Sequence, residues 1–95
     1  MPAYVIVEIK VHDTAKFAEY KKKAPPSIAA YGGKYLVRGG PVEILDGTWA
    51  PERIVILEFP SMARAREWYN CEQYTEAVQL RHASATSKFI LVEGM

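Results

Sequence analysis

The alternation of apolar and polar positions predicts a strand followed by a helix in the first third of the chain. Residues 3–11 (AYVIVEIKV) are rich in β-branched residues and place them alternately on two faces, as a strand does. After Asp13, which can cap a helix, apolar residues recur at steps of three and four. Pro25–Pro26 predicts a kink or a restart of this helix, because proline lacks an amide donor. Gly32–Gly33 can adopt positive φ and end it.

The middle of the chain predicts a β-hairpin with a longer loop. Residues 34–46 (KYLVRGGPVEILD) indicate a long strand that is broken at Gly39–Pro41, where glycine tolerates a bulge and proline cannot donate to a neighbouring strand. Residues 53–59 (RIVILEF) indicate the third strand. Trp49 falls in the loop between them.

A second helical region and a last strand complete the pattern. Ser61 can cap a helix, a break is expected around Asn70–Cys71, and a further helical piece follows. Residues 88–93 (KFILVE) indicate the last strand. The order β-α-β-β-α-β predicts one α+β domain over residues 1–95. Its fold would be ferredoxin-like, with a four-stranded antiparallel sheet and both helices on one face.

The two late strands are apolar on both faces. In the third strand, Ile54 and Ile56 lie on one face and Val55, Leu57 and Phe59 on the other. In the last strand, Phe89 and Leu91 lie opposite Ile90 and Val92. Two helices can cover only one face of such a sheet. We therefore expect a homodimer in which a second copy covers the other face.

Composition and charge narrow the function classes. The chain has 95 residues, with 12 Lys and Arg against 11 Asp and Glu and a net charge of +1, which disfavours binding to nucleic acid. No apolar run approaches the roughly 20 residues of a membrane span, and no secretory signal is recognised, so we expect a cytoplasmic protein. The single Cys71 excludes an internal disulfide, and no metal-ligand spacing is found.

Several segments together resemble one protein family. They are YGGKYLVRGG (31–40), EILDGTWAPERIVILEFPS (43–61), WYNCEQY (68–74), RHASA (81–85) and VEG (92–94). In this order and spacing they resemble the domain of unknown function 1330 family over nearly the whole chain.

The resemblance implies a ferredoxin-like dimeric α/β barrel, related in fold to small monooxygenases, muconolactone isomerases and haem-binding chlorite dismutase-like proteins. The family's own reaction is not established, and fold analogy does not supply one. Similar proteins usually have Ser-Pro where this chain has Cys71 and Glu72. We predict that Cys71 starts a helix without catalytic duty. Because neither His12 nor His82 falls on a predicted cavity face, we expect no haem and no other cofactor.

Arg38 and Glu58 are the charged residues from which a reaction could be built. Arg38 ends an apolar strand segment, and folding of the hairpin would bring it near the level of Glu58. One interpretation is a structural ion pair. The other is an anchor for a carboxylate or enolate, with Glu58 or a tyrosine in proton transfer.

An aromatic set on the helices and the hairpin loop could line a cavity for a flat organic molecule. The candidate ligand-binding residues are Tyr31, Arg38, Trp49, Trp68, Tyr74 and Arg81. Two hypotheses follow. The first is a small-molecule-binding homodimer that acts as a cofactor-free enzyme, monooxygenase-like or isomerase-like, on a small aromatic or enolisable acid. The alternative is a non-catalytic binding or structural dimer.

Overall fold

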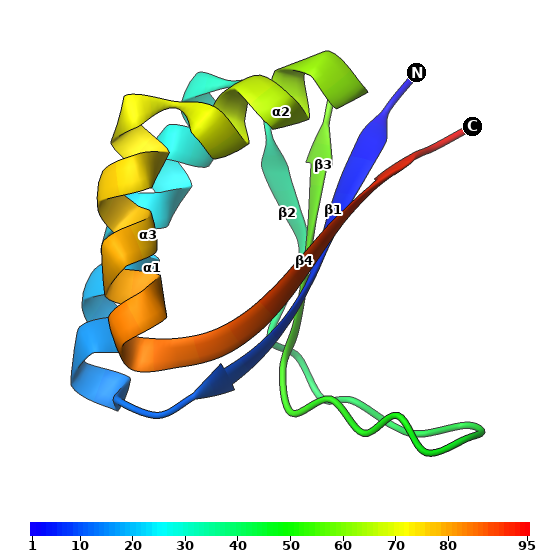
Figure 1. Ribbon diagram of the computed structural model, residues 1–95. Coiled ribbons are helices and arrows are strands. Elements are labelled where there is room, and N and C mark those ends of the chain that lie inside the picture. Colours follow the sequence, from blue (N-terminus) through cyan, green and yellow to red (C-terminus); the bar gives the residue numbers. More distant parts are fainter.

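The computed structural model describes residues 1–95, which form a four-stranded antiparallel sheet with helices on one face (Figure 1). The elements along the chain are β1 (Ala3–Val11), α1 (Thr14–Ala30), β2 (Lys34–Arg38), β3 (Ile54–Phe59), α2 (Met62–Asn70), α3 (Glu72–Ser84) and β4 (Ala85–Glu93). The sheet order is β2-β3-β1-β4, so that β1 pairs with both β3 and β4. The predicted ferredoxin-like α+β fold is confirmed. The second helical region is divided at Cys71, as the sequence predicts.

Helix α1 continues through its two prolines without the predicted restart. Its N-terminus is capped by Asp13, whose carboxylate accepts from the Lys16 amide at 3.0 Å. Pro25 has no amide proton to donate to the Lys21 carbonyl one turn earlier. The Arg38 guanidinium donates to that carbonyl instead, at 3.2 Å. A side chain from β2 thus satisfies the acceptor that the proline leaves free, and the helix persists to Ala30.

Strand β2 is much shorter than the predicted strand over residues 34–46. It ends at Arg38, and Gly39 has a φ of +75°, which turns the chain out of the sheet. A Cβ placed on Gly39 would also lie 2.5 Å from the Arg53 Cζ atom, so glycine suits this position on two grounds. Residues 39–53 contain no strand and project from the body as an arm (Figure 1). The bulge lies between Tyr35 and Val37 rather than at the glycine pair.

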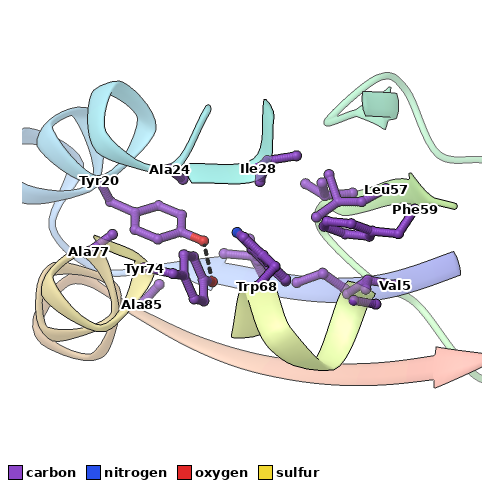
Figure 2. Close-up of a cluster of buried hydrophobic side chains, with 14 of the residues drawn as sticks. Val5, Tyr20, Ala24, Ile28, Leu57, Phe59, Trp68, Tyr74, Ala77 and Ala85 are labelled. Carbon is purple, nitrogen blue, oxygen red and sulfur yellow. Dashed lines mark hydrogen bonds between the residues drawn. The ribbon is translucent and has the colours of Figure 1, made fainter. Parts of the chain in front are cut away.

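The core lies between the helices and the inner face of the sheet. Alternate residues of β1 and β3 are buried there, among them Val5, Val7, Leu57 and Phe59. The Trp68 indole packs against them (Figure 2) and donates to the Ser27 hydroxyl at 3.0 Å. This bond satisfies the only polar atom that the indole brings into the core.

Candidate functional site

A chain of polar side chains runs through the apolar layer between α1 and α3. The Tyr20 and Tyr74 hydroxyls are 2.8 Å apart (Figure 2), and Arg81 donates from Nη1 to the Tyr74 hydroxyl at 2.7 Å. Tyr74 and Arg81 are seven residues apart on α3 and therefore share one face of that helix. Helical spacing alone brings these two groups together. The third group comes from a different helix.

Arg81 is the most unusual charge in the molecule. The residue is only 3% exposed, yet it takes part in none of the ion pairs. Its guanidinium lies over the Phe89 ring, 4.1 Å from the centroid, and Nη2 approaches the Tyr69 hydroxyl at 3.5 Å. Its Nε is buried without a hydrogen-bond partner. Buried charges are normally paired, because removing them from water is costly.

The neighbouring tyrosines do not supply the missing negative charge. Burial is the largest cause that raises the pKa of Tyr74 far above its ordinary value, and burial also raises the pKa of Tyr20. Both phenols are therefore neutral at physiological pH. The Arg81 guanidinium has hydrogen-bond acceptors around it but no counter-ion.

A hollow of about 480 Å³ opens beside Arg81. It is lined by Tyr69, Arg81, His82, Thr86, Ser87 and Phe89, which come from α2, α3 and the first half of β4. The His82 ring adds a contact, because the Arg81 Nη2 lies 3.3 Å from its Nε2. The hollow thus combines a buried cation and hydroxyl groups with aromatic rings, a lining suited to a polar organic ligand.

A second hollow of about 240 Å³ adjoins the first. Trp68, Tyr69 and Phe89 are among its lining residues. Tyr69 and Phe89 line both hollows, and their rings are 5.7 Å apart. This aromatic pair is therefore the wall between two openings along β4. We call the two openings together the β4 groove.

The predicted cavity that reaches Arg38 is small. It lies between the helices and the sheet, is lined by Arg38 and Trp68 among others, and has a volume of about 30 Å³. That volume suits a water molecule or a small chemical group. A flat organic molecule fits the β4 groove by size and does not fit this cavity.

Arg38 and Glu58 are not brought together, which corrects the expectation from hairpin folding. Arg38 lies opposite Val55 on the helix-covered face, whereas Glu58 is on the other face and forms an ion pair with Lys34 at 3.1 Å. The bulge after Tyr35 shifts the register by one residue and so changes which side chains share a face.

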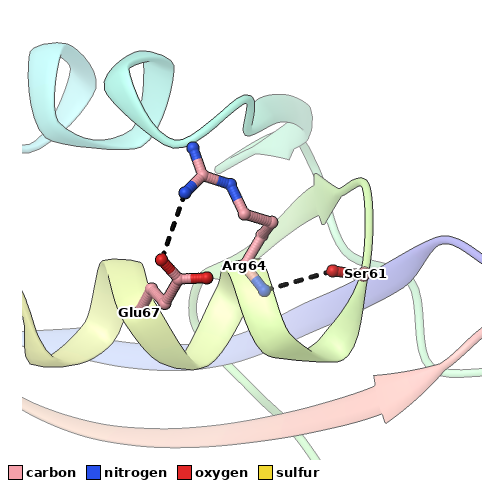
Figure 3. Close-up of polar contacts among 3 residues, drawn as sticks. All are labelled: Ser61, Arg64 and Glu67. Carbon is pink, nitrogen blue, oxygen red and sulfur yellow. Dashed lines mark hydrogen bonds and ion pairs between the residues drawn. The ribbon is translucent and has the colours of Figure 1, made fainter.

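Trp49 and Tyr31 also lie outside the β4 groove. The Trp49 indole donates to the Glu8 carboxylate at 3.1 Å, on the face that the helices leave open. Tyr31 follows the last residue of α1, and the Arg64 guanidinium lies 4.8 Å from its ring centroid. The Glu67 carboxylate, one turn further along α2, lies 3.2 Å from the same guanidinium. Figure 3 shows this ion pair.

Only part of the site was predicted from the sequence. Trp68, Tyr74 and Arg81 were candidates, and in the structure Tyr74 contacts both of the others. Tyr69 and Phe89 were not among the candidate ligand-binding residues. His82 was expected to lie away from any cavity, and that expectation is wrong, because it lines the larger hollow. A signal existed for His82, because it follows Arg81 directly at the end of a helix.

Cys71 occupies the position predicted for it. Its sulfur accepts from the Tyr74 amide at 3.4 Å, and it is the N-cap of α3. It thereby helps to fix the first turn of the helix that carries Tyr74 and Arg81.

No group of three His, Cys, Asp or Glu side chains is arranged to hold a metal ion. None of the helices combines the length and the apolar character needed to cross a membrane.

The fold places the chain in a class, the ferredoxin-like α+β proteins, with helices on one face of the sheet and the other face open. The sequence then gives the family: the chain belongs to the domain of unknown function family DUF1330, which it matches over residues 2–95. No curated protein sequence matches the chain.

Solved structures share this fold at low sequence identity. A protein of unknown function from Rhodopseudomonas palustris is 22% identical with a TM-score of 0.82, over 99% of this chain and 82% of that one. SnoaB, a cofactor-independent oxygenase from Streptomyces nogalater, is 13% identical with a TM-score of 0.65, over 99% and 93%. A dimeric ferredoxin-like protein of unknown function from Jannaschia is 11% identical with a TM-score of 0.67, over 99% and 100%.

Proposed function

We propose that this protein is a homodimer that binds a small, flat organic acid in the β4 groove, with Arg81 as its counter-ion. The observation that carries the proposal is Arg81, a residue that is 3% exposed and whose guanidinium has no acidic partner and retains a buried Nε without a hydrogen bond. A carboxylate or enolate would supply the missing negative charge. It could also accept two parallel hydrogen bonds from the planar fork of the guanidinium.

The aromatic walls support a planar ligand. Tyr69 and Phe89 separate the two hollows, and the Trp68 indole borders the smaller one. Rings of this kind favour flat apolar surfaces, through offset or edge contacts. An aromatic acid, or an acid that can form a planar enolate, combines the charge and the shape that the groove offers.

Arg81 takes the anchoring role that the sequence analysis gave to Arg38, and tyrosine remains the candidate for proton transfer in place of Glu58. The hydroxyls of Tyr74 and Tyr20 form a connected pair that begins at the guanidinium. A fold shared with a cofactor-independent oxygenase supports a cofactor-free reaction, monooxygenase-like or isomerase-like, as one form of the proposal. The other form is binding without a reaction.

The open face of the sheet supports the homodimer. Ile6 lies opposite Ile56 on β3 and opposite Ile90 on β4, which makes an apolar row across three strands. Ile90 is 61% exposed and Val92 is 44% exposed. Contiguous apolar rows of this kind mark interaction sites, and a second copy presents a matching face. Two structures with this fold are of dimeric proteins, which agrees with the proposal.

The test of ligand binding compares two arginine variants. Aromatic acids, hydroxy acids and their neutral amides are screened by thermal shift and then by calorimetry against wild type, Arg81→Lys and Arg64→Lys. We expect an acid, and not its amide, to stabilise wild type. Arg81→Lys should bind that acid roughly ten times more weakly, because an ammonium lacks the fork. Arg64→Lys, which changes an arginine outside the groove, should bind as wild type does.

Two results would overturn the binding proposal: no acid stabilises the wild type, or the acid stabilises Arg81→Lys equally well. The bound acid is then incubated with the protein in air and followed by mass spectrometry and proton NMR. Conversion that is lost in Tyr74→Phe supports the enzymatic form. An acid that binds and stays unchanged supports the non-catalytic form.

A further inference from the structure

Three cationic side chains surround the small cavity between α1 and the sheet, and no acidic residue lines it. Lys21 comes from α1, Arg38 ends β2, and Arg53 directly precedes β3. None of the three belongs to an ion pair. Like charges that converge in this way repel one another, and an anion between them would relieve that repulsion.

The two arginines are held in place by their surroundings. Arg38 donates to the Lys21 carbonyl at 3.2 Å, and its guanidinium lies 4.4 Å from the Tyr35 ring centroid. Arg53 lies 5.6 Å from the Phe17 ring centroid and fills the space beside Gly39. Because both guanidinium groups rest on aromatic or backbone surfaces, less side-chain entropy would be lost when an anion binds.

Arg53 also retains an unused donor. Its Nε is buried and has no hydrogen-bond partner, the same condition found at Arg81. Behind the three cations the lining is apolar and includes Phe17, Val55 and Leu57. The cavity volume of about 30 Å³ leaves room for a small group only. Charge at the entrance and apolar surface behind it define an amphiphilic site of small size.

We propose that Lys21, Arg38 and Arg53 form a second anion-binding site, which takes a small carboxylate with a short apolar tail. The carboxylate lies among the three cations and the tail enters the cavity. Inorganic phosphate has the charge but no tail, so it fits the entrance less well. The site does not depend on the proposed function, because it shares neither its cations nor its opening with the β4 groove; only the Trp68 and Phe89 rings border both.

The test follows the arginine side chains individually. Nitrogen-labelled protein is titrated with acetate, butyrate, butyramide and inorganic phosphate, and the Nε–H signals of Arg53 and Arg81 are recorded by NMR. We expect butyrate to shift the Arg53 signal with saturation. Each methylene that enters the cavity should tighten binding about fourfold, so butyrate should exceed acetate. Butyramide and phosphate should bind much more weakly.

Variants assign the effect to this entrance. Arg53→Lys removes the fork, and Lys21→Met removes an exposed cation without disturbing the core. Both should weaken butyrate binding several-fold, as followed at the Arg38 Nε–H signal, because Arg53→Lys removes the Arg53 signal. Arg81→Lys should leave the response of Arg53 unchanged. An Arg53 signal that does not respond to butyrate overturns the proposal. Equal binding of phosphate or butyramide also overturns it, and so does unchanged binding in both variants at the entrance. Failure of the β4 groove to bind acids would leave this result untouched.

Discussion

The two faces of the sheet are made from the same alternating strands and end in opposite states. On the inner face, residues such as Val7 and Leu57 are buried under the helices. On the outer face, their sequence neighbours Ile6 and Ile56 share a row with Ile90, which remains largely exposed. The comparison teaches that an apolar residue in a strand indicates that this side of the sheet has to be buried. It does not indicate whether the same chain or a second copy buries it.

The faces also differ in how they treat charge. The inner side buries Arg81 without a counter-ion, whereas the outer side pairs Lys34 with Glu58 and lets Trp49 donate to Glu8. The charges on the outer side are thus neutralised within one chain, although its apolar row stays exposed. The buried guanidinium on the inner side lacks a counter-ion, and this contrast underlies the proposed ligand site.

The largest effect should come from the inner face, at Trp68. This residue is 1% exposed, and its indole stacks on Phe59 and Tyr74 with centroids 5.2 and 4.2 Å away. Trp68→Ala should lower the free energy of unfolding by about 3–5 kcal/mol, through lost burial and an unfilled cavity. Urea denaturation measures it, with Trp49→Ala on the outer side as the matched control. A loss at Trp68 no larger than at Trp49 would contradict the described core.

The outer face is tested at Ile90. Ile90→Asp should weaken the dimer about 100-fold, or by about 2.7 kcal/mol, because the interface would bury an unpaired carboxylate. The fold should persist, since the residue is mostly exposed in the single chain. Sedimentation velocity measures the change in mass, with the exposed helix position Ala63→Asp as control. A wild-type protein that sediments as a monomer, or a dimer indifferent to Ile90→Asp, would exclude this interface.

The buried tyrosines should make the free energy of unfolding depend on pH. Burial raises the pKa of Tyr20 and of Tyr74 above the ordinary value of 10.0. Above pH 10 the unfolded chain loses these protons while the folded chain keeps them, so stability is full below pH 10 and falls as the pH rises. The slope should reach about 1.4 kcal/mol per pH unit for each such tyrosine. Urea denaturation across this range measures it, and Tyr20→Phe should reduce the slope by one tyrosine. A flat profile would contradict the burial of these phenols.

Much of the fold could be predicted because it depends on local pattern. The strand alternation, the Asp13 cap and the division at Cys71 are properties of adjacent residues, and each is confirmed. The predictions that failed depend on contacts between residues far apart in the sequence. Helix α1 continues past Pro25, and the carbonyl that this proline leaves free accepts from Arg38 on a distant strand. No local pattern contains that bond.

The same distinction applies to the candidate site. Tyr74 and Arg81 were predictable together because helical spacing places them on one face. The pairing of Arg38 with Glu58 failed because a single bulged residue in β2 changes the face on which every later side chain lies. The sequence predicts which residues of one helix or one regular strand lie on the same face. It does not give the hollow between α3 and β4, which exists only once the helices are placed on the sheet.

The smallest effect should come from the outer ion pair. The Lys34 Nζ and a Glu58 carboxylate oxygen are 3.1 Å apart, with side-chain exposures of 68% and 25%. Water screens such a pair, so Lys34→Met should cost the isolated chain less than about 1 kcal/mol. In the proposed dimer the neighbouring face is covered, and Glu58 would then stay behind as a less solvated, unpaired carboxylate. The loss should therefore grow at protein concentrations at which the dimer forms.

Urea denaturation at low and high protein concentration measures this difference, and Lys22→Met, which breaks an exposed pair with Glu19 on α1, is the control. A loss at Lys34 that is the same at both concentrations would mean that Glu58 remains in water, and that the second copy does not extend over this end of the sheet.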